Sequence, residues 1–347
     1  MTHLISILVA LAAPLVLGKS PKPMMEILQS EQRAGYVCNL VEYNATPSER
    51  VRAYLLVPDG AGRNDRRPGI VMLHDHGARF DIGKEKLVRP LPTAPEHVRL
   101  SSQQWIRDNF DGVWFADSLA SLGYVVIVPD MLYWGSRSSE ACRKWSRVHF
   151  GLEEGDEKQL KNLVYEGQRA VYDSLQRQGI VWAEQTLRED AAAARLLGSL
   201  DCVRKDRIGC FGWSMGAHRA WLLGAFCNEV KTGVALCWMT LKSTVKLPYK
   251  ASDYSMLIPQ LRDSYDFPDI AAWLAPKPFF FLNGLQDKLF PVWSVSSAFA
   301  TMREYYKLRG SEDKLRTAFF DGPHHCGLEV QAMIVSYLEE QLPMRGR

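Results

Sequence analysis

Short, nearly continuous apolar runs alternate along the chain with longer amphipathic stretches. A continuous apolar run predicts a strand covered on both faces, because a strand with one wet face alternates apolar and polar residues. Such runs lie at residues 69–74, 124–128, 208–211, 232–238, 278–283 and 316–321. Helical stretches lie at residues 110–122, 160–178, 181–200, 217–226, 293–308 and 328–341. This alternation predicts an α/β fold with a mostly parallel sheet and helices on both faces.

The segments outside this alternation differ in character. Residues 36–43 and 51–58 alternate apolar and polar positions and predict an antiparallel hairpin that enters the sheet. Residues 81–104 predict a long polar loop, and residues 131–160 mix aromatic side chains with charges and glycines. We therefore expect one domain over 19–347, with a loop insertion around 131–160 that forms a lid or a pocket wall.

The N-terminal stretch of the chain, residues 1–18, is almost wholly apolar from Leu4 onward and is followed by polar residues. It predicts either a signal peptide that is cut after Gly18 or an apolar N-terminal helix that packs on the domain. No Lys or Arg precedes Leu4, so the charged start of a signal peptide is missing, and the stretch is short for a membrane span. The first interpretation predicts a periplasmic or secreted protein, and the alternative is a cytoplasmic one.

The charge balance argues against a nucleic-acid partner, and the cysteine content argues against a disulfide scaffold. The 347 residues include 42 basic and 39 acidic side chains, for a net charge of +3, and the absence of a dense basic stripe argues against nucleic-acid binding. Seven cysteines are an odd number, and four of them lie in or beside apolar segments, which favours buried thiols over a disulfide scaffold. The spacing of Cys and His residues indicates no metal site.

Residues 207–220, RIGCFGWSMGAHRA, carry the strongest chemical motif. An apolar run, the pentapeptide G-x-S-x-G and a helix-favouring segment follow one another, which is the strand–turn–helix context of a nucleophile elbow. Glycine on both sides lets the strand and the helix approach closely, and the turn places Ser214 at a helix N-terminus. There the backbone N–H of Met215 can stabilise a developing oxyanion.

A serine nucleophile needs a base and an acid that orients the base. Asp287 follows the apolar run 278–283, and two histidines, His324 and His325, follow the run 316–321. Either histidine can be the base on this reasoning. The second oxyanion donor is expected from the loop after residues 69–74, as the backbone N–H of His76.

These segments resemble the α/β-hydrolases of the dienelactone-hydrolase-like and acetyl-xylan-esterase-like group. The resemblance spans about residues 36–342 and is carried by VRAYLLVP, LHDHGARFDIGKE, PDMLYWGSR, GWSMG, LAPKPFFFLNGLQDKLFP and GPHHCGLEVQ. In that group the base is the histidine directly after proline, which selects His324. The chain departs from the group at three positions: Asp75 replaces a glycine, Ser214 replaces the cysteine of dienelactone hydrolases, and Cys326 replaces an aromatic residue.

The resemblance implies an α/β-hydrolase fold and a serine esterase that acts through an acyl-enzyme without a metal or an organic cofactor. The partner would be a small-molecule or carbohydrate ester, such as a short acyl or an acetylated sugar, and the protein would have no nucleic-acid partner and no stable membrane span. Four aromatic side chains are expected to line the substrate pocket: Trp134, Trp213, Trp238 and Phe290. A serine peptidase or amidase of the same fold is the alternative, followed by a binding protein without catalytic activity.

Overall fold

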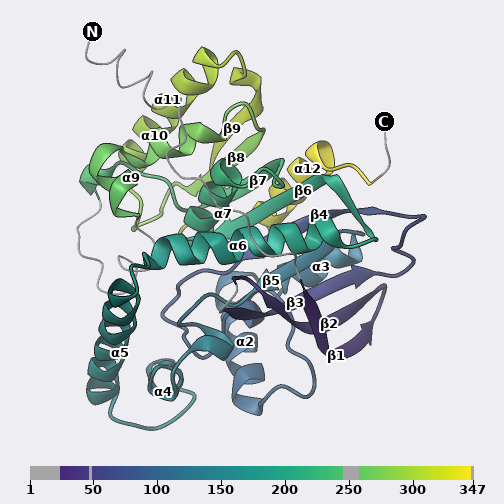
Figure 1. Cartoon of the computed structure of the whole chain (residues 1–347). Coiled ribbons are helices and arrows are strands. Elements are labelled where there is room, and N and C mark those ends of the chain that lie inside the picture. The colour runs from purple at the N-terminus through teal and green to yellow at the C-terminus, as the bar shows by residue number, and fades with distance from the viewer. Residues whose placement is uncertain (1–23, 47–48, 245–257, 345–347) are drawn as a thin grey trace.

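A nine-stranded sheet runs through the middle of the molecule (Figure 1). The computed structural model describes residues 24–46, 49–244 and 258–344. The strands are β1 (Met25–Arg33), β2 (Tyr36–Asn44), β3 (Arg50–Pro58), β4 (Arg67–Leu73), β5 (Val125–Pro129), β6 (Val203–Trp213), β7 (Thr232–Leu236), β8 (Phe279–Gly284) and β9 (Leu315–Phe320). The helices are α2 (Glu96–Asn109), α3 (Phe115–Ser121), α4 (Glu140–His149), α5 (Glu157–Arg177), α6 (Trp182–Ser199), α7 (Met215–Phe226), α9 (Pro259–Ser264), α10 (Phe267–Ala271), α11 (Val292–Leu308) and α12 (Leu328–Gln341).

The strand order is β1-β2-β3-β5-β4-β6-β7-β8-β9. The first three strands form an antiparallel meander, as the alternating pattern of 36–43 and 51–58 predicts, and β3 pairs antiparallel with β5. From β5 to β9 every pair is parallel, with Val71 of β4 opposite Ile127 of β5 and Cys210 of β6. The carboxyl ends of six strands therefore meet at one edge of the sheet.

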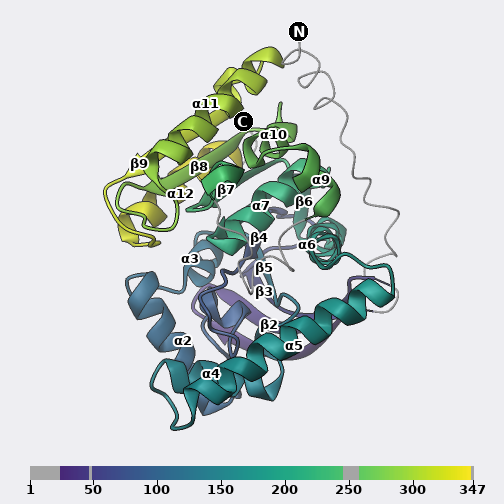
Figure 2. The same cartoon turned by 90° about the vertical axis from the view of Figure 1, so that its left-hand side faces the viewer.

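Both faces of the parallel strands are covered. Side chains of β4 alternate between two apolar clusters, with Val71 and Leu73 in one and Ile70 and Met72 in the other. The first cluster includes residues of α6, α7 and α11, and the second includes residues of α2, α3 and α12. Figures 1 and 2 show α6 and α7 crossing one face of the sheet. The predicted α/β architecture is confirmed.

The prediction of a polar loop over 81–104 is wrong. The short 3-10 helix η1 (Lys84–Lys86) lies in this segment, and α2 begins at Glu96, directly after Pro95. The helix predicted at 110–122 is shorter than expected, because Asp111 and Gly112 turn the chain with positive φ angles of 51° and 80° before α3 begins.

The aromatic segment 131–160 is more regular than predicted. Ser139 caps α4, its side-chain oxygen accepting from the N–H of Cys142 at 3.3 Å. Tyr133 and Trp145 are buried, and the Tyr133 hydroxyl donates to the carbonyl of Val164 in α5 at 2.8 Å. Much of the segment therefore packs as core around α4 and is not an irregular insertion.

The interpretation of residues 1–18 as a signal peptide or an apolar helix lies outside the described residues. Among the described helices, none has both the length and the apolar character that crossing a bilayer requires. All seven cysteines fall within the described residues and are free thiols, as the odd count suggested.

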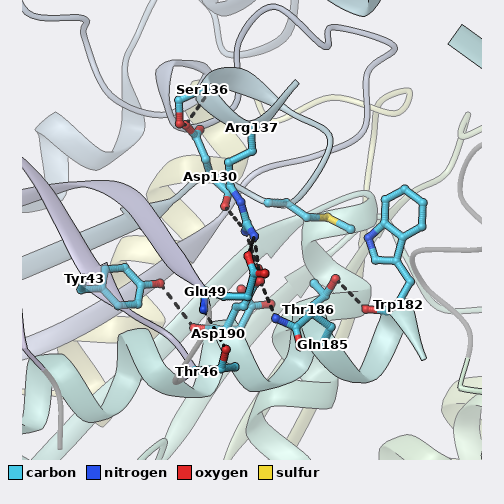
Figure 3. Close-up of polar contacts among 12 residues, drawn as sticks. Tyr43, Thr46, Glu49, Asp130, Ser136, Arg137, Trp182, Gln185, Thr186 and Asp190 are labelled. Atoms are coloured by element: carbon cyan, nitrogen blue, oxygen red, sulfur yellow. Dashed lines mark hydrogen bonds and ion pairs between the residues drawn. The ribbon is translucent and has the colours of Figure 1, made fainter. Parts of the chain in front are cut away.

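Arg137 connects the loop after β5 to helix α6 and to the turn before β3 (Figure 3). It ends the 3-10 helix η2 (Gly135–Arg137), and its Nη2 donates to Glu189 Oε1 at 2.8 Å and lies 3.4 Å from Glu49 Oε2. The side chain of Gln185 donates to the same Glu189 oxygen at 3.0 Å. The side chains of Arg137 and Glu189 are 10% and 3% exposed, so the pair is largely desolvated.

We expect Arg137→Met to lower the free energy of unfolding by about 3 kcal/mol or more, because it leaves the Glu189 carboxylate buried without its cation. Arg169→Met is the matched control: Arg169 pairs with Asp173 at the surface, with side chains 70% and 43% exposed. Its removal is expected to change stability by less than about 1 kcal/mol. Urea unfolding of both variants measures the difference, and equal losses would contradict a structural role for the buried pair.

Candidate active site

Ser214 occupies a sharp turn between β6 and α7. Its φ and ψ are 55° and −126°, a strained conformation for a residue with a side chain. The Ser214 N–H donates to the carbonyl of Leu236 at 2.8 Å, and its own carbonyl accepts from the N–H of Ala217 at 2.8 Å. These bonds hold the strained turn at the carboxyl edge of the sheet, with the serine partly exposed.

The glycines of the G-x-S-x-G motif are required by close backbone contacts. A Cβ added to Gly212 would lie 1.9 Å from the carbonyl oxygen of Gly216. A Cβ added to Gly216 would lie 1.9 Å from the carbonyl oxygen of Leu73 in β4. Strand β6, helix α7 and strand β4 can therefore approach this closely only with glycine at both positions.

Asp287 and His324 lie together, as predicted. The imidazole Nδ1 of His324 donates to Asp287 Oδ2 at 2.8 Å. Asp287 Oδ1 accepts from the backbone N–H groups of Leu289 at 2.8 Å and Phe290 at 3.3 Å, and the aspartate side chain is fully buried. Because an ionised carboxylate can only accept, Nδ1 carries the proton and Nε2 of His324 presents a lone pair.

The second histidine of the motif points elsewhere. His325 Nε2 lies 2.8 Å from Asp111 Oδ1, in the turn between α2 and α3. Asp111 also accepts from the backbone N–H of Leu328 at 2.9 Å and so ties this turn to the start of α12. Of the two histidines that the sequence left open, His324 is the one in contact with Asp287.

The Ser214 hydroxyl has no hydrogen-bond partner within the described part of the chain. Catalytic hydrogen bonds often shorten only when the substrate binds. The ring of Trp213, the residue before the serine, packs on the His324 imidazole at a centroid distance of 5.3 Å.

Two further aromatic rings pack in series beyond the His324 imidazole. The Phe290 ring lies 6.0 Å from the imidazole, and the Trp238 ring lies 5.6 Å from Phe290. Both are slightly exposed, at 7% for Phe290 and 9% for Trp238. With Trp213 they form one apolar side of the site.

Trp134 does not lie in this position, although it was expected to line the pocket. Its side chain is fully buried, and its indole N–H donates to the carbonyl of His76 at 3.1 Å. It packs edge-on against the His76 ring at 5.1 Å. Trp134 therefore supports the loop after β4 from the protein interior and does not face solvent.

The loop after β4 includes His76, whose backbone N–H the sequence predicts as an oxyanion donor. Over residues 24–46, 49–244 and 258–344, the backbone N–H groups of His76 and Met215 donate to no protein acceptor. The His76 ring accepts from the N–H of Ala78 at 3.0 Å, and burial lowers the pKa of His76 to about 3, so the ring is neutral. Burial also lowers the pKa of His74, whose Nδ1 donates to the carbonyl of Asp75 at 2.9 Å.

Three polar side chains near the site have no role that the sequence predicts, although Asp75 stands out there as a departure from the related hydrolases. Asp75 and Lys86 form a buried ion pair behind the loop after β4, with Asp75 Oδ2 3.5 Å from Lys86 Nζ. Cys237 directly follows β7, and its sulfur, a His324 ring nitrogen and an Asp287 oxygen all lie within 4.8 Å of one another. Burial raises the pKa of Cys237, which keeps the thiol neutral beside the Asp287–His324 pair.

We expect Gly216→Ala to disrupt the elbow, because the new methyl group would lie 1.9 Å from the Leu73 carbonyl oxygen. The predicted loss is more than about 3 kcal/mol of unfolding free energy, or loss of soluble protein. Gly62→Ala is the control, since a Cβ there meets nothing within 4 Å. Thermal unfolding compares the two, and a Gly216→Ala protein as stable as the control would contradict the close approach of β4 and α7.

His218 gives a prediction of pH dependence. This residue of α7 is 3% exposed, its ring packs 4.3 Å from that of Trp238, and burial lowers its pKa from 6.5 to about 3. Between these two pKa values the unfolded chain binds the extra proton, so stability is lost as the pH falls below 6.5. We expect the wild type to lose about 2 kcal/mol more than His218→Phe between pH 7 and pH 5. Urea unfolding at both pH values tests this, and parallel losses would show that His218 titrates normally.

Comparisons with known proteins show what the chain is similar to. Residues 106–253 match the Dienelactone hydrolase family. YtaP of Bacillus subtilis (strain 168), which is named as a hydrolase, is 23% identical over 322 residues, covering 92% of each chain.

Two solved structures share the fold. One is from Bacteroides fragilis NCTC 9343, is named as an acetyl xylan esterase, and superposes with a TM-score of 0.63 at 20% identity, covering 88% of this chain and 71% of its own. The other is a glucuronoyl esterase from Solibacter usitatus, with a TM-score of 0.63 at 14% identity, covering 97% of this chain and 91% of its own. The solved structures show the α/β-hydrolase fold, and the match over residues 106–253 together with the relative indicates a hydrolase similar to the Dienelactone hydrolase family.

Proposed function

We propose that the chain is a serine esterase that cleaves a carboxylic ester through an acyl-enzyme. Ser214 is the nucleophile, His324 the general base and Asp287 the acid that orients it. The observation that carries the proposal is the His324–Asp287 hydrogen bond of 2.8 Å at the same sheet edge as the strained Ser214 turn. A base whose tautomer is held by a buried carboxylate, at the same sheet edge as a strained and partly exposed serine, is the arrangement that acyl transfer needs.

In the acylation half-reaction, Ser214 Oγ attacks the ester carbonyl carbon while His324 Nε2 takes the hydroxyl proton. The imidazolium that forms is stabilised by Asp287 through Nδ1. The carbonyl oxygen becomes an oxyanion that accepts hydrogen bonds from the N–H groups of His76 and Met215. When the bond to the alcohol oxygen breaks, His324 returns the proton to the leaving alcohol and the acyl group stays on Ser214.

In the deacylation half-reaction, a water molecule replaces the alcohol. His324 Nε2 takes a proton from the water, whose oxygen attacks the acyl carbon, and the same two N–H groups hold the second oxyanion. The bond to Ser214 Oγ breaks, the serine regains its proton from His324, and the carboxylic acid leaves. Each oxyanion donor is worth about 10²–10³-fold in rate in hydrolases of this type.

The apolar side formed by Trp213, Trp238 and Phe290 favours a short acyl group or the alcohol of the ester. The names of the structural neighbours, an acetyl xylan esterase and a glucuronoyl esterase, point to acetylated xylan and glucuronoyl esters as the first compounds to test. An acetylated xylo-oligosaccharide is therefore the proposed substrate class, in line with the resemblance seen in the sequence.

Labelling with a fluorophosphonate probe, combined with assays on p-nitrophenyl acetate and an aminoacyl nitroanilide, tests the reaction class. We expect the wild type to label and to cleave the acetate faster than the anilide. Ser214→Ala should abolish labelling. A wild type that does not label would leave only a binding protein, and faster anilide turnover would assign the site to amide cleavage.

The two adjacent histidines provide a matched pair for the base. His324→Ala is expected to lower kcat on p-nitrophenyl acetate by about 10²–10⁴-fold, because no other group takes the serine proton. His325→Ala removes only the contact with Asp111 and should change kcat by less than about threefold. Equal effects of the two substitutions would contradict the assignment of His324. Release of acetate from acetylated xylo-oligosaccharide, absent in Ser214→Ala, tests the substrate class separately.

A further inference from the structure

Lys86 is a buried lysine whose ammonium group binds the backbone of the loop after β4. It ends η1, and its side chain has no exposed surface. Its Nζ donates to the carbonyl oxygens of Asp75 and His76, both at 2.8 Å, and lies 3.5 Å from Asp75 Oδ2. An ammonium group has three N–H donors, and these three acceptors match them in number.

The first of these carbonyls belongs to the peptide whose N–H is the proposed oxyanion donor. The C=O of Asp75 and the N–H of His76 share one planar trans peptide group and therefore point in opposite directions. Because Lys86 binds the Asp75 carbonyl oxygen, the His76 N–H of the same peptide group points away from Lys86. The same reasoning links the His76 carbonyl to the N–H of Gly77.

Other side chains hold the same stretch of backbone. Arg219 Nη1 donates to the carbonyl of His74 at 3.3 Å, and Trp134 donates to that of His76. Lys86 differs from both because it reaches two successive carbonyls at once.

Gly77 gives the backbone of this loop additional conformational freedom. Gly77 has a φ of 51°, a region that glycine enters without strain, so the peptide beside it can rotate at low cost. The loop also packs tightly, since a Cβ at Gly77 would lie 2.2 Å from the Trp105 ring. The Lys86 ammonium lies 5.2 Å from the centre of that ring. Lys86 therefore links two successive peptide groups of the loop, Asp75–His76 and His76–Gly77, to the buried Trp105 side chain.

We propose that Lys86 is a positioning residue for catalysis: by binding the Asp75 and His76 carbonyls, it directs the His76 N–H toward the oxyanion. This inference rests on the proposed esterase function and adds a residue that acts through the backbone without touching the substrate. Asp75 balances the charge of Lys86, so the effect of the lysine comes mainly from the geometry it imposes.

The protonation state of Lys86 follows from its surroundings. Burial lowers the pKa of Lys86 to about 8, and the nearby carboxylates offset part of that shift. Above this pH the amine keeps two N–H groups for three acceptors, so the support of the loop weakens. The titratable and charged groups that face the ammonium are Asp75, Asp81, Arg79 and the neutral imidazoles of His74 and His76.

The test is a double variant, Lys86→Met with Asp75→Asn, which removes the ammonium without leaving a buried carboxylate unpaired. The matched control is Lys277→Met. Lys277 Nζ also donates to two backbone carbonyls, those of Gly224 at 2.6 Å and Cys227 at 2.9 Å, but at the end of α7 opposite Ser214. Steady-state kinetics on p-nitrophenyl acetate, far-UV circular dichroism and fluorophosphonate labelling to completion are measured for each protein.

We expect kcat of the double variant to fall by about 10–10³-fold while KM stays within about threefold, because the interaction lost is made in the transition state. Labelling of Ser214 should still reach completion, at a lower rate. Lys277→Met should keep kcat within twofold. Above pH 8 we also expect kcat of the wild type to decline through one ionisation, and this decline should be missing in the double variant.

A folded double variant with kcat within twofold of the wild type would overturn the proposal. If that variant does not fold, the pH profile of the wild type decides, and a kcat that stays constant from pH 7.5 to 9.5 would overturn it equally. If the esterase assignment itself is wrong, the result is different: the wild type would then neither react with the fluorophosphonate probe nor cleave p-nitrophenyl acetate.

Discussion

Six neighbouring strands, in the order β5-β4-β6-β7-β8-β9, run parallel, and this alignment determines where the residues of the candidate site lie. Parallel strands bring their carboxyl ends to one edge, so residues 76, 214, 287 and 324, far apart in the sequence, leave the sheet on the same side. The elbow adds strain at this edge. Two glycines let β4, β6 and α7 close on one another, and Ser214 is held in a conformation that an isolated peptide would avoid.

Buried charges behind this edge are arranged around backbone carbonyls. Arg219 pairs with Asp190 and reaches the carbonyl of His74, and Lys86 pairs with Asp75 and reaches the next two carbonyls. Buried ion pairs are weak sources of stability because desolvation offsets most of their attraction. Their value here lies in geometry, since each cation fixes the direction of a peptide group in a loop without regular secondary structure.

Much of this arrangement could be predicted from the sequence, because strands buried on both faces give continuous apolar runs and the elbow has a fixed spacing. Local spacing left His324 and His325 open, and only the resemblance selected His324. The contacts that distinguish them, with Asp287 and with Asp111, are made by residues distant in the sequence. Helix α2 was missed because residues 81–104 read as polar. The roles of Trp134 and Lys86 were missed for a related reason: a side chain that bonds to backbone carbonyls leaves no pattern in residue types.

In the proposed reaction, Ser214 carries the acyl group during turnover. Acid quenching of the wild type during the first turnovers of p-nitrophenyl acetate, followed by peptide mapping with mass spectrometry, tests it most directly. We expect one acetyl group, located on the peptide that contains Ser214. It should accumulate in His324→Ala no faster than in the wild type. Turnover of the ester with the acetyl group on another residue, or with no covalent adduct at any quench time, would contradict it.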